Sequence, residues 1–195
     1  MSPRLPIRPA TIVDEPRCAG RLARRNGFTL IELLIVVAII GIIAAIAIPS
    51  LLRARVSANE ATAIGDIRTV LSAESTYQAS NGGAYDIPGC LAVPSACIPG
   101  YLPTAPTFLD AQMASPGPKQ GYNRFFTAGA VVAPLPTNMS PSSVSTYVYG
   151  ATPIAQDQTG VRGFAGDAGA RICQTLNGTD PAAGASSLPN GCNPL

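Results

Sequence analysis

The hydrophobic residues of this chain are concentrated in one run near the N-terminus. Residues 33–48 contain no polar side chain, and the apolar stretch as a whole extends from Phe28 to about Leu52. A helix needs about 20 mostly apolar residues to cross a bilayer, so this stretch is long enough to span one. Helical spacing of apolar residues continues to about Ser80, which predicts a single helix about 80 Å long.

The second half of this predicted helix, residues 53–82, is apolar on one side only. A one-sided helix needs a partner for its apolar face, whereas the first half, which is apolar all round, needs apolar surroundings on every side. Asn81, Gly82 and Gly83 form a helix stop signal. The residues of the one-sided stripe are Val56, Ala63, Ile64, Ile67, Val70, Leu71 and Tyr77.

Beyond Ala84 the helical signals fade and turn residues become frequent. Residues 86–119 contain seven prolines and predict a long loop, with a short helix near residues 107–114. The four residues 166–169 have hairpin-turn chemistry, and the tail from Asn177 is rich in turns and poor in strands. The strand-like runs are Tyr122–Ala128, Ser145–Ala151, Val161–Ala165 and Ala170–Gln174.

Charged residues are few and unevenly placed. The formal net charge is +2, but six of the 13 basic residues precede Gly27, together with only two acids. Without that leader, seven basic and nine acidic side chains remain, which gives no basic bias toward nucleic acid. Arg24 and Arg25 precede the apolar run, and Arg53 and Arg55 follow it. The larger basic excess on the N-terminal side predicts that this end is cytoplasmic and that the rest of the chain faces outward.

The basic leader differs from an ordinary signal peptide in the order of its parts. In a signal peptide the cleavage site follows the apolar core. Here the charged residues end at Gly27 and the apolar run begins at once, while the nearest small-residue site, residues 45–47, has no polar sequence after it. Cleavage before the apolar run would keep that run in the mature protein.

The sharpest motif is the run Gly27-Phe28-Thr29-Leu30-Ile31-Glu32, which opens the apolar stretch. It resembles the cleavage and methylation segment of type IV prepilins and type II secretion pseudopilins, and the resemblance covers about residues 24–85. It implies that a membrane aspartic peptidase cleaves between Gly27 and Phe28 and methylates the new amino group of Phe28. The implied fold class is α+β, with a long N-terminal helix packed on a small antiparallel β-sheet head.

Glu32 is the acid within the apolar span. A carboxylate there is unfavourable by about 2.5–3.5 kcal/mol even on permissive insertion scales, so it needs a partner. Its apolar neighbours offer none, whereas the amino group of Phe28 in an adjacent subunit would supply one and set the register between helices. The alternative is an acid at the membrane border that reaches water.

Gly41 and Pro49 are the helix-breaking residues of the apolar half. Transmembrane helices tolerate both residue types without any special function. The family resemblance implies instead that the helix loosens between these two positions when it is packed in a filament.

Five cysteines are present, of which Cys18 falls in the leader. Histidine is absent and no C-x-x-C pair occurs, which argues against zinc. Export to an oxidising compartment favours disulfides. Four cysteines allow three pairings, and the simplest is the local one, which we predict: Cys90 with Cys97 and Cys173 with Cys192. The tail loop also resembles the disulfide-closed C-terminal region of many type IV pilins, and four unrelated thiols are the alternative.

No residue pattern indicates an enzyme. A Ser/His/Asp triad is impossible without histidine, and the acids show no paired catalytic arrangement. Asp157, Asp167 and Asp180 are sparse and form no calcium-binding loop of the D-x-[DN]-x-[DN]-G type. Neither a metal ion nor another cofactor is therefore expected.

These observations predict a structural filament subunit. Its expected parts are a leader (1–27), a transmembrane and assembly half-helix (28–52), an amphipathic half-helix (53–82) and a β-rich head (83–195) with a Pro-rich loop and a disulfide-closed tail. The expected partners are further copies of the chain with minor pilins, the prepilin peptidase and methyltransferase, an inner-membrane assembly platform, and membrane lipid before assembly. The subunit would reside in the bacterial inner membrane and then in a cell-surface pilus. A periplasmic pseudopilus of a type II secretion system and a membrane-tethered binding module are the alternatives.

Overall fold

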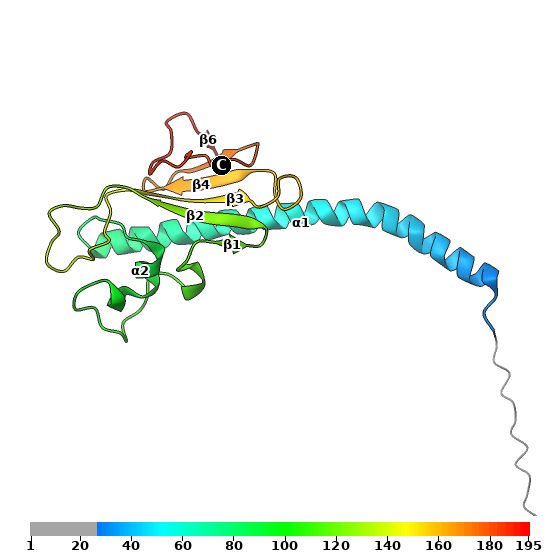
Figure 1. Ribbon diagram of the computed structural model, residues 1–195, viewed down its shortest axis with the longest axis horizontal. Coiled ribbons are helices and arrows are strands. Elements are labelled where there is room, and N and C mark those ends of the chain that lie inside the picture. The colour runs from blue at the N-terminus through cyan, green and yellow to red at the C-terminus, as the bar shows by residue number, and fades with distance from the viewer. Residues whose placement is uncertain (1–26) are drawn as a thin grey trace, which may run out of the picture. The chain divides into compact units, whose positions relative to one another are not determined.

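The computed structural model describes residues 27–195, so the leader lies outside the described residues except for Gly27. The predicted long helix is confirmed as α1, Leu30–Ser80 (Figure 1). It ends at the predicted stop signal, where Gly82 and Gly83 adopt φ values of 62° and 88°. These left-handed conformations, which glycine adopts without a steric penalty, let the chain leave the helix axis.

The chain divides into two compact units, one that ends at Ile43 and one that comprises Ala44–Leu195. In the first unit the described residues are the start of α1 and the three residues before it. The second unit contains the rest of α1, the sheet and the connecting loops.

The head is built on a six-stranded antiparallel sheet in which the strands are neighbours in chain order, from β1 to β6 (Figure 1). The longest ladder joins β2 to β3 through seven residue pairs. Antiparallel neighbours need only short connections, which explains this simple order. The strands are β1 Pro118–Lys119, β2 Tyr122–Ala128, β3 Tyr147–Pro153, β4 Gly163–Asp167, β5 Ile172–Thr175 and β6 Asn193–Pro194.

The amphipathic part of α1 packs on one face of this sheet. Gly166 of β4 lies directly under the helix, since a Cβ atom there would be 2.8 Å from Leu71 Cδ1 and 2.9 Å from Ile67 Cγ2. The absence of a side chain at this position therefore sets how closely helix and sheet approach. The buried residues of this interface include Ala63, Ile67, Val70 and Tyr77 of α1 and Tyr122, Tyr147, Tyr149, Ala151 and Phe164 of the sheet.

The opposite face of the sheet is covered by the C-terminal tail. Val148, Ala165 and Cys173 of the sheet pack there against Ala182 and Leu188 of the tail. The two clusters alternate along each strand, as the two-residue period of a strand requires. The head of this unit is therefore a three-layer arrangement of helix, sheet and tail, and the predicted α+β class is confirmed.

The four predicted strands are present in the predicted order, as β2 to β5, whereas the two-residue strands β1 and β6 were not predicted. The predicted run Tyr122–Ala128 coincides with β2, while β3, β4 and β5 each begin two residues later than predicted. Consequently, Gly166 and Asp167 belong to β4, and the predicted turn at 166–169 lies two residues further on.

The Pro-rich loop contains more helix than predicted. A short 3₁₀ helix, Ala111–Met113, falls inside the predicted range 107–114. A five-residue helix α2, Pro88–Ala92, and a 3₁₀ turn, Pro94–Ala96, were not predicted. Both begin with proline, which fits the first turn of a helix because that position needs no N–H donor.

Candidate processing and assembly site

The N-terminal end of α1 is closed by a capping box formed by Thr29 and Glu32. The Thr29 N–H and hydroxyl donate to Glu32 Oε2 at 3.0 and 2.7 Å, and the Glu32 N–H donates to Thr29 Oγ1 at 3.2 Å. Such reciprocal bonds satisfy donors that the helix start leaves unpaired. The sequence interpretation found no partner for Glu32 among its apolar neighbours and overlooked Thr29, the polar residue three positions earlier. The pattern T-x-x-E before an apolar run is the signal that identifies the cap.

The capping box uses only one of the two carboxylate oxygens of Glu32. Every hydrogen bond that residues 27–195 make with this carboxylate goes to Oε2. Oε1 therefore remains available to a donor from outside the described chain. One side chain can in this way hold the helix start and bind a further group at the same time.

The peptide bond between Gly27 and Phe28 precedes α1. Both residues have non-helical backbone and are exposed, and the Phe28 side chain is 79% accessible. Exposed, irregular backbone is the kind of segment that proteases cleave. The geometry of this bond is therefore compatible with the predicted cleavage.

The apolar half of α1 is uncovered in the described chain. By length and composition, α1 is the one described helix that could cross a membrane, and none of its most apolar window is buried. A helix that is apolar on all sides needs apolar surroundings, which here must come from lipid or from other protein chains. α1 is continuous through Gly41 and Pro49, so neither residue breaks the helix in this structure. Loosening between them inside a filament stays a prediction.

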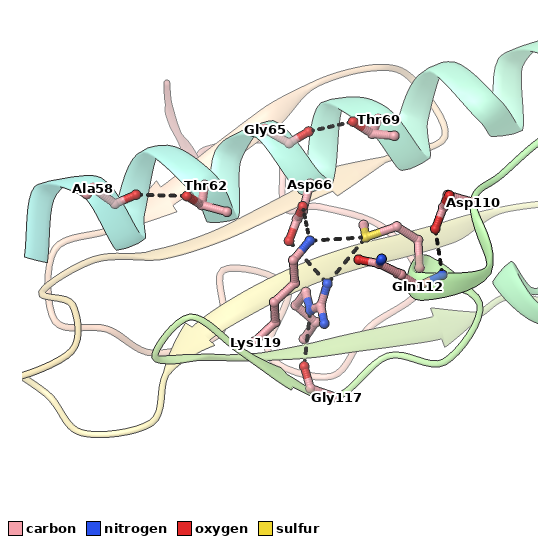
Figure 2. Close-up of polar contacts among 11 residues, drawn as sticks. Ala58, Thr62, Gly65, Asp66, Thr69, Asp110, Gln112, Gly117 and Lys119 are labelled. Atoms are coloured by element: carbon pink, nitrogen blue, oxygen red, sulfur yellow. Dashed lines mark hydrogen bonds and ion pairs between the residues drawn. The ribbon is translucent and has the colours of Figure 1, made fainter. Parts of the chain in front are cut away.

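The Asp66 carboxylate of α1 forms ion pairs with two basic side chains from the first two strands of the sheet (Figure 2). Its Oδ1 lies 2.9 Å from Lys119 Nζ, and its Oδ2 lies 3.1 Å from Arg124 Nη1. The Arg124 side chain is only 6% exposed and also donates to the Gly117 carbonyl at 3.1 Å and to Met113 Sδ at 3.3 Å. This cluster fixes β1 and β2 to the helix.

Glu60 of α1 binds the segment that leads into β4. Its Oε1 accepts the backbone N–H groups of Val161 and Arg162 at 3.0 and 3.1 Å. Its Oε2 accepts Nε and Nη2 of Arg162 at 2.9 and 2.6 Å. Burial acts to raise the pKa of Glu60, but the hydrogen bonds from Arg162 and Val161 outweigh it and hold the pKa below its ordinary value. This carboxylate is therefore ionised and fully paired.

Glu74 is a third acid on the buried side of α1, and it makes no ion pair with the described residues. Its Oε2 accepts the Asp86 N–H at 3.2 Å, while its buried Oε1 has no partner. Burial raises the pKa of Glu74 to about 8; the Asp86 N–H lowers it in part, and the Asp86 carboxylate adds to the rise. Glu74 is therefore mainly protonated at neutral pH.

Only one of the two predicted disulfides is formed. Cys173 of β5 is bonded to Cys192, with the two Cα atoms 5.7 Å apart, and this bond ties the tail to the sheet. Among residues 27–195, Cys90 and Cys97 are free thiols, so the bridge predicted between them is absent from the structure. Burial is the main cause that raises the pKa of the Cys90 thiol, and a hydrogen bond with Cys97 is the next largest. The half-buried Cys97 lies just after the 3₁₀ turn.

Sequence reasoning missed the three acids of α1 that lie in the head. Glu60 and Glu74 fall at the three- and four-residue spacing of the apolar stripe that includes Ala63, Val70 and Tyr77. An acid at such a position is expected to be buried and so to need a partner or a proton. The spacing was therefore a usable signal for their burial, although not for the identity of their partners.

Comparison with known proteins places the N-terminal segment in context. The prokaryotic N-terminal methylation motif matches residues 22–48. The chain is 49% identical over 56 residues to the type IV wide pilus major component PilA4 of Thermus thermophilus, which is 29% of this chain and 43% of that protein. It is 44% identical over 54 residues to the type IV major pilin protein PilA of Myxococcus xanthus, 28% and 24% of the two chains.

A secretion protein is also among the relatives. The type II secretion system core protein G of Pseudomonas aeruginosa is 38% identical over 58 residues, 30% of this chain and 41% of that protein. The chain thus covers less than half the length of each of these three relatives. No solved structure matches it.

Proposed function

Because this chain carries the N-terminal segment of the type IV prepilin and pseudopilin family, we propose that it is a structural subunit of a type IV pilus-like filament. A prepilin peptidase removes the leader between Gly27 and Phe28, and the new amino group of Phe28 is methylated. Residues 28–52 then hold the subunit in the inner membrane until it is assembled. The observation that carries this proposal is the uncovered apolar helix whose capped start retains one free oxygen of Glu32.

The physics of the bilayer explains why Glu32 matters for assembly. Lipid tails are as apolar as leucine, so an apolar helix gains no hydrophobic free energy when it leaves lipid for a filament. What distinguishes the filament is packing and polar pairing. The amino group of Phe28 in a neighbouring subunit can bind Oε1 of Glu32, and a charge pair in a medium of low dielectric constant is strong when its geometry is good.

The same pair would set the register between neighbouring helices. Leucine, isoleucine, valine and alanine are spread all round this part of α1, so dispersion contacts alone fit several registers with similar energy. Glu32 is the one charged side chain of Phe28–Leu52 and therefore the one position that marks a unique register.

A pseudopilin of a type II secretion system is the second candidate, supported by the similarity to core protein G. Such a subunit would use the same helix in a short periplasmic filament. The disulfide-closed tail and the Pro-rich loop of the head favour a surface pilus. Electron microscopy of the cell surface with and without the gene separates the two, since only a pilus subunit is needed for surface filaments.

Variants of Glu32 test the assembly role and separate it from capping. Glu32→Gln keeps an acceptor for the capping box but removes the charge, whereas Glu32→Ala removes both. Thr29→Ala is the matched control, because it removes the hydroxyl of the cap and leaves the carboxylate. We expect both Glu32 variants to remain processed and in the membrane but to form few or no filaments, while Thr29→Ala still forms them.

Membrane fractionation beside electron microscopy of sheared filaments reads out this experiment. Normal filament numbers from Glu32→Gln would show that the carboxylate serves only as a cap, and would refute the charge-pair model. Mass spectrometry of the N-terminus tests processing separately. Assembled subunits should begin with a methylated Phe28, and a chain that still begins before Gly27 would contradict the proposed cleavage.

A further inference from the structure

We propose that a groove between the start of the amphipathic half of α1 and the head binds the phosphate group of an anionic membrane phospholipid. We call it the interfacial groove. Its helix side is formed by seven of the residues 52–60, and its head side by residues of the β1–β2 turn and the β3–β4 loop and by Leu176. Its volume is about 1140 Å³. The inference rests on the proposed function, because it requires that residues 28–52 span a bilayer.

The position of the interfacial groove along α1 matches the depth of the lipid headgroups. Residues 30–52 form a helical segment about 35 Å long, which covers a hydrocarbon core of about 30 Å. The headgroup layer adds about 5–7 Å on each side. The helix wall of the groove begins at Leu52 and rises about 12 Å to Glu60, so it starts at the hydrocarbon boundary and passes through this layer.

The charges in the interfacial groove leave two arginines for a ligand. Arg162 and Glu60 line the groove but are bonded to each other. Arg53 and Arg55 are exposed and form no ion pair with any residue in 27–195. Asp157 is the one further acid in the lining. Two arginines against one aspartate give a cationic excess, and the guanidinium group is well suited to bind phosphate oxygens.

The apolar residues of the interfacial groove point to a lipid rather than to a free anion. Leu52, Val161 and Leu176 are 57%, 38% and 68% exposed. They come from both the helix and the head, and they line the same groove as the two arginines. A phosphate ion in water would leave these side chains exposed, whereas the glycerol and first methylene groups of a phospholipid would cover them.

Photolabelling of the full-length chain in proteoliposomes tests this inference. The bilayer is phosphatidylcholine with a trace of either phosphatidylglycerol or phosphatidylcholine that carries a diazirine in its headgroup. We expect peptides from residues 52–60 and 157–176 to be labelled together, with about fivefold more label from phosphatidylglycerol. The double variant Arg53→Gln/Arg55→Gln should abolish this preference, and Arg68→Gln, an exposed arginine further along the same helix, should keep it.

The head side of the groove has its own variant and control. Leu176→Ser should reduce the label on the head peptide at least threefold, because it removes apolar contact area on that side. Leu102→Ser is the matched control, since Leu102 is 67% exposed and does not line the groove. Equal effects of these two variants would contradict a specific site.

Three results would overturn the inference. Label confined to the helix, with residues 157–176 no more labelled than the peptide that contains Leu102, would show that lipid does not enter the groove. Chain-to-chain cross-links from a photoreactive residue at position 176, without lipid label, would assign the groove to a second copy of the chain. Extraction of the protein by alkaline carbonate would refute membrane insertion and with it the proposed function, whereas retained protein with an unlabelled head would refute only the groove.

Discussion

Glu74 should make the stability of the head fall as the pH rises from 5 to 7.5. Its pKa is raised from the ordinary value of 4.5 to about 8 in the folded protein, chiefly by burial. In this pH range the folded chain holds a proton on Glu74 that the unfolded chain has lost. Folding therefore takes up a proton, and the free energy of unfolding falls by about 1.4 kcal/mol per pH unit.

The total effect is large in comparison with the stability of a domain. Below pH 4.5, the raised pKa of Glu74 contributes its full stabilisation of the folded state, about 5 kcal/mol. This stabilisation is lost as the pH rises through about 8. Between pH 5 and 7.5 we expect a loss of about 3 kcal/mol. Other shifted groups act outside this window. The lowered pKa of Glu60 acts below its ordinary value of 4.5, and the raised pKa of the Cys90 thiol acts above 9.

Glu74→Gln tests this reasoning because glutamine has the same shape and can still accept the Asp86 N–H. The variant should lose the pH slope between 5 and 7.5. Its buried amide N–H groups lower stability by about 1–3 kcal/mol at every pH. We therefore expect it to be less stable than the native chain at pH 5 and more stable above pH 8. Asp110→Asn, which changes a carboxylate that is exposed on the head surface, should keep the native slope.

Thermal unfolding of the full chain in detergent, followed by near-ultraviolet circular dichroism, is the measurement. The chain has no tryptophan, and its six tyrosines all lie between Tyr77 and Tyr149, so the signal reports on the head. Parallel pH profiles for the native chain and Glu74→Gln would refute the reasoning, because they would show that Glu74 does not take up a proton on folding.

The other predictions concern the contacts that hold the three layers together. Asp66→Asn should lower the free energy of unfolding by about 3 kcal/mol, since it leaves the buried Arg124 guanidinium without its countercharge; an unchanged melting temperature would contradict this. Cys192→Ser opens a loop with a sequence separation of 19 residues and should destabilise the chain by about 3 kcal/mol, with faster proteolysis of the tail than of the sheet. Gly166→Ala should destabilise by about 1–3 kcal/mol because the new Cβ meets the helix. Gly65→Ala, on the open side of α1, should instead stabilise by about 0.5–1 kcal/mol, and equal effects of the two alanine variants in a denaturant titration would contradict the packing argument.

The parts of the fold that depend on local periodicity could be predicted from the sequence. The 3.6-residue spacing of apolar residues gave the length of α1 and the face that packs on the sheet, including Ile67 and Tyr77. The aromatic and β-branched runs gave the four strands β2 to β5 in their correct order, but not the two-residue edge strands β1 and β6. These sequence patterns are local. A helix or strand buries one of its faces whichever element packs against it, so the pattern can be recognised without knowledge of the partner.

The displaced starts of β4 and β5 have causes that local patterns do not contain. The predicted strand at 161–165 begins late because the N–H groups of Val161 and Arg162 donate to Glu60, which lies about one hundred residues earlier in the chain. The next strand begins late because the Asp167 carboxylate accepts the N–H groups of Gly169 and Arg171 and so extends the turn. In both cases an acidic side chain accepts hydrogen bonds from backbone N–H groups. The strand propensity of the segment alone would place these N–H groups in the hydrogen-bond ladder between two strands.

The contacts of the candidate site likewise include some that the sequence could predict and others that depend on the fold. The capping box of Thr29 and Glu32 spans three residues, so the pattern was visible in the sequence even though it was not used. The partners of Asp66, in contrast, lie 53 and 58 residues away along the chain. Without the fold, nothing identifies Lys119 and Arg124 as those partners. The free thiols of the Pro-rich loop likewise show that closeness in sequence was not sufficient to predict a bond there.

The charged side chains of α1 differ in whether they have a partner within the chain. This difference fits the proposed function, in which the subunit resides in the membrane before it is assembled. Glu60 and Asp66 are satisfied within the chain, so they fix the head to the helix without a partner chain. Glu32 is satisfied at one oxygen by Thr29, which under the proposed function reduces the penalty for holding a carboxylate in lipid. Its second oxygen and Arg53, which forms no ion pair within residues 27–195, can each bind a partner from outside the chain. Under the proposed function, the head and helix of the subunit are held together by contacts within the chain, and the remaining polar groups are left for a neighbouring subunit or a lipid headgroup.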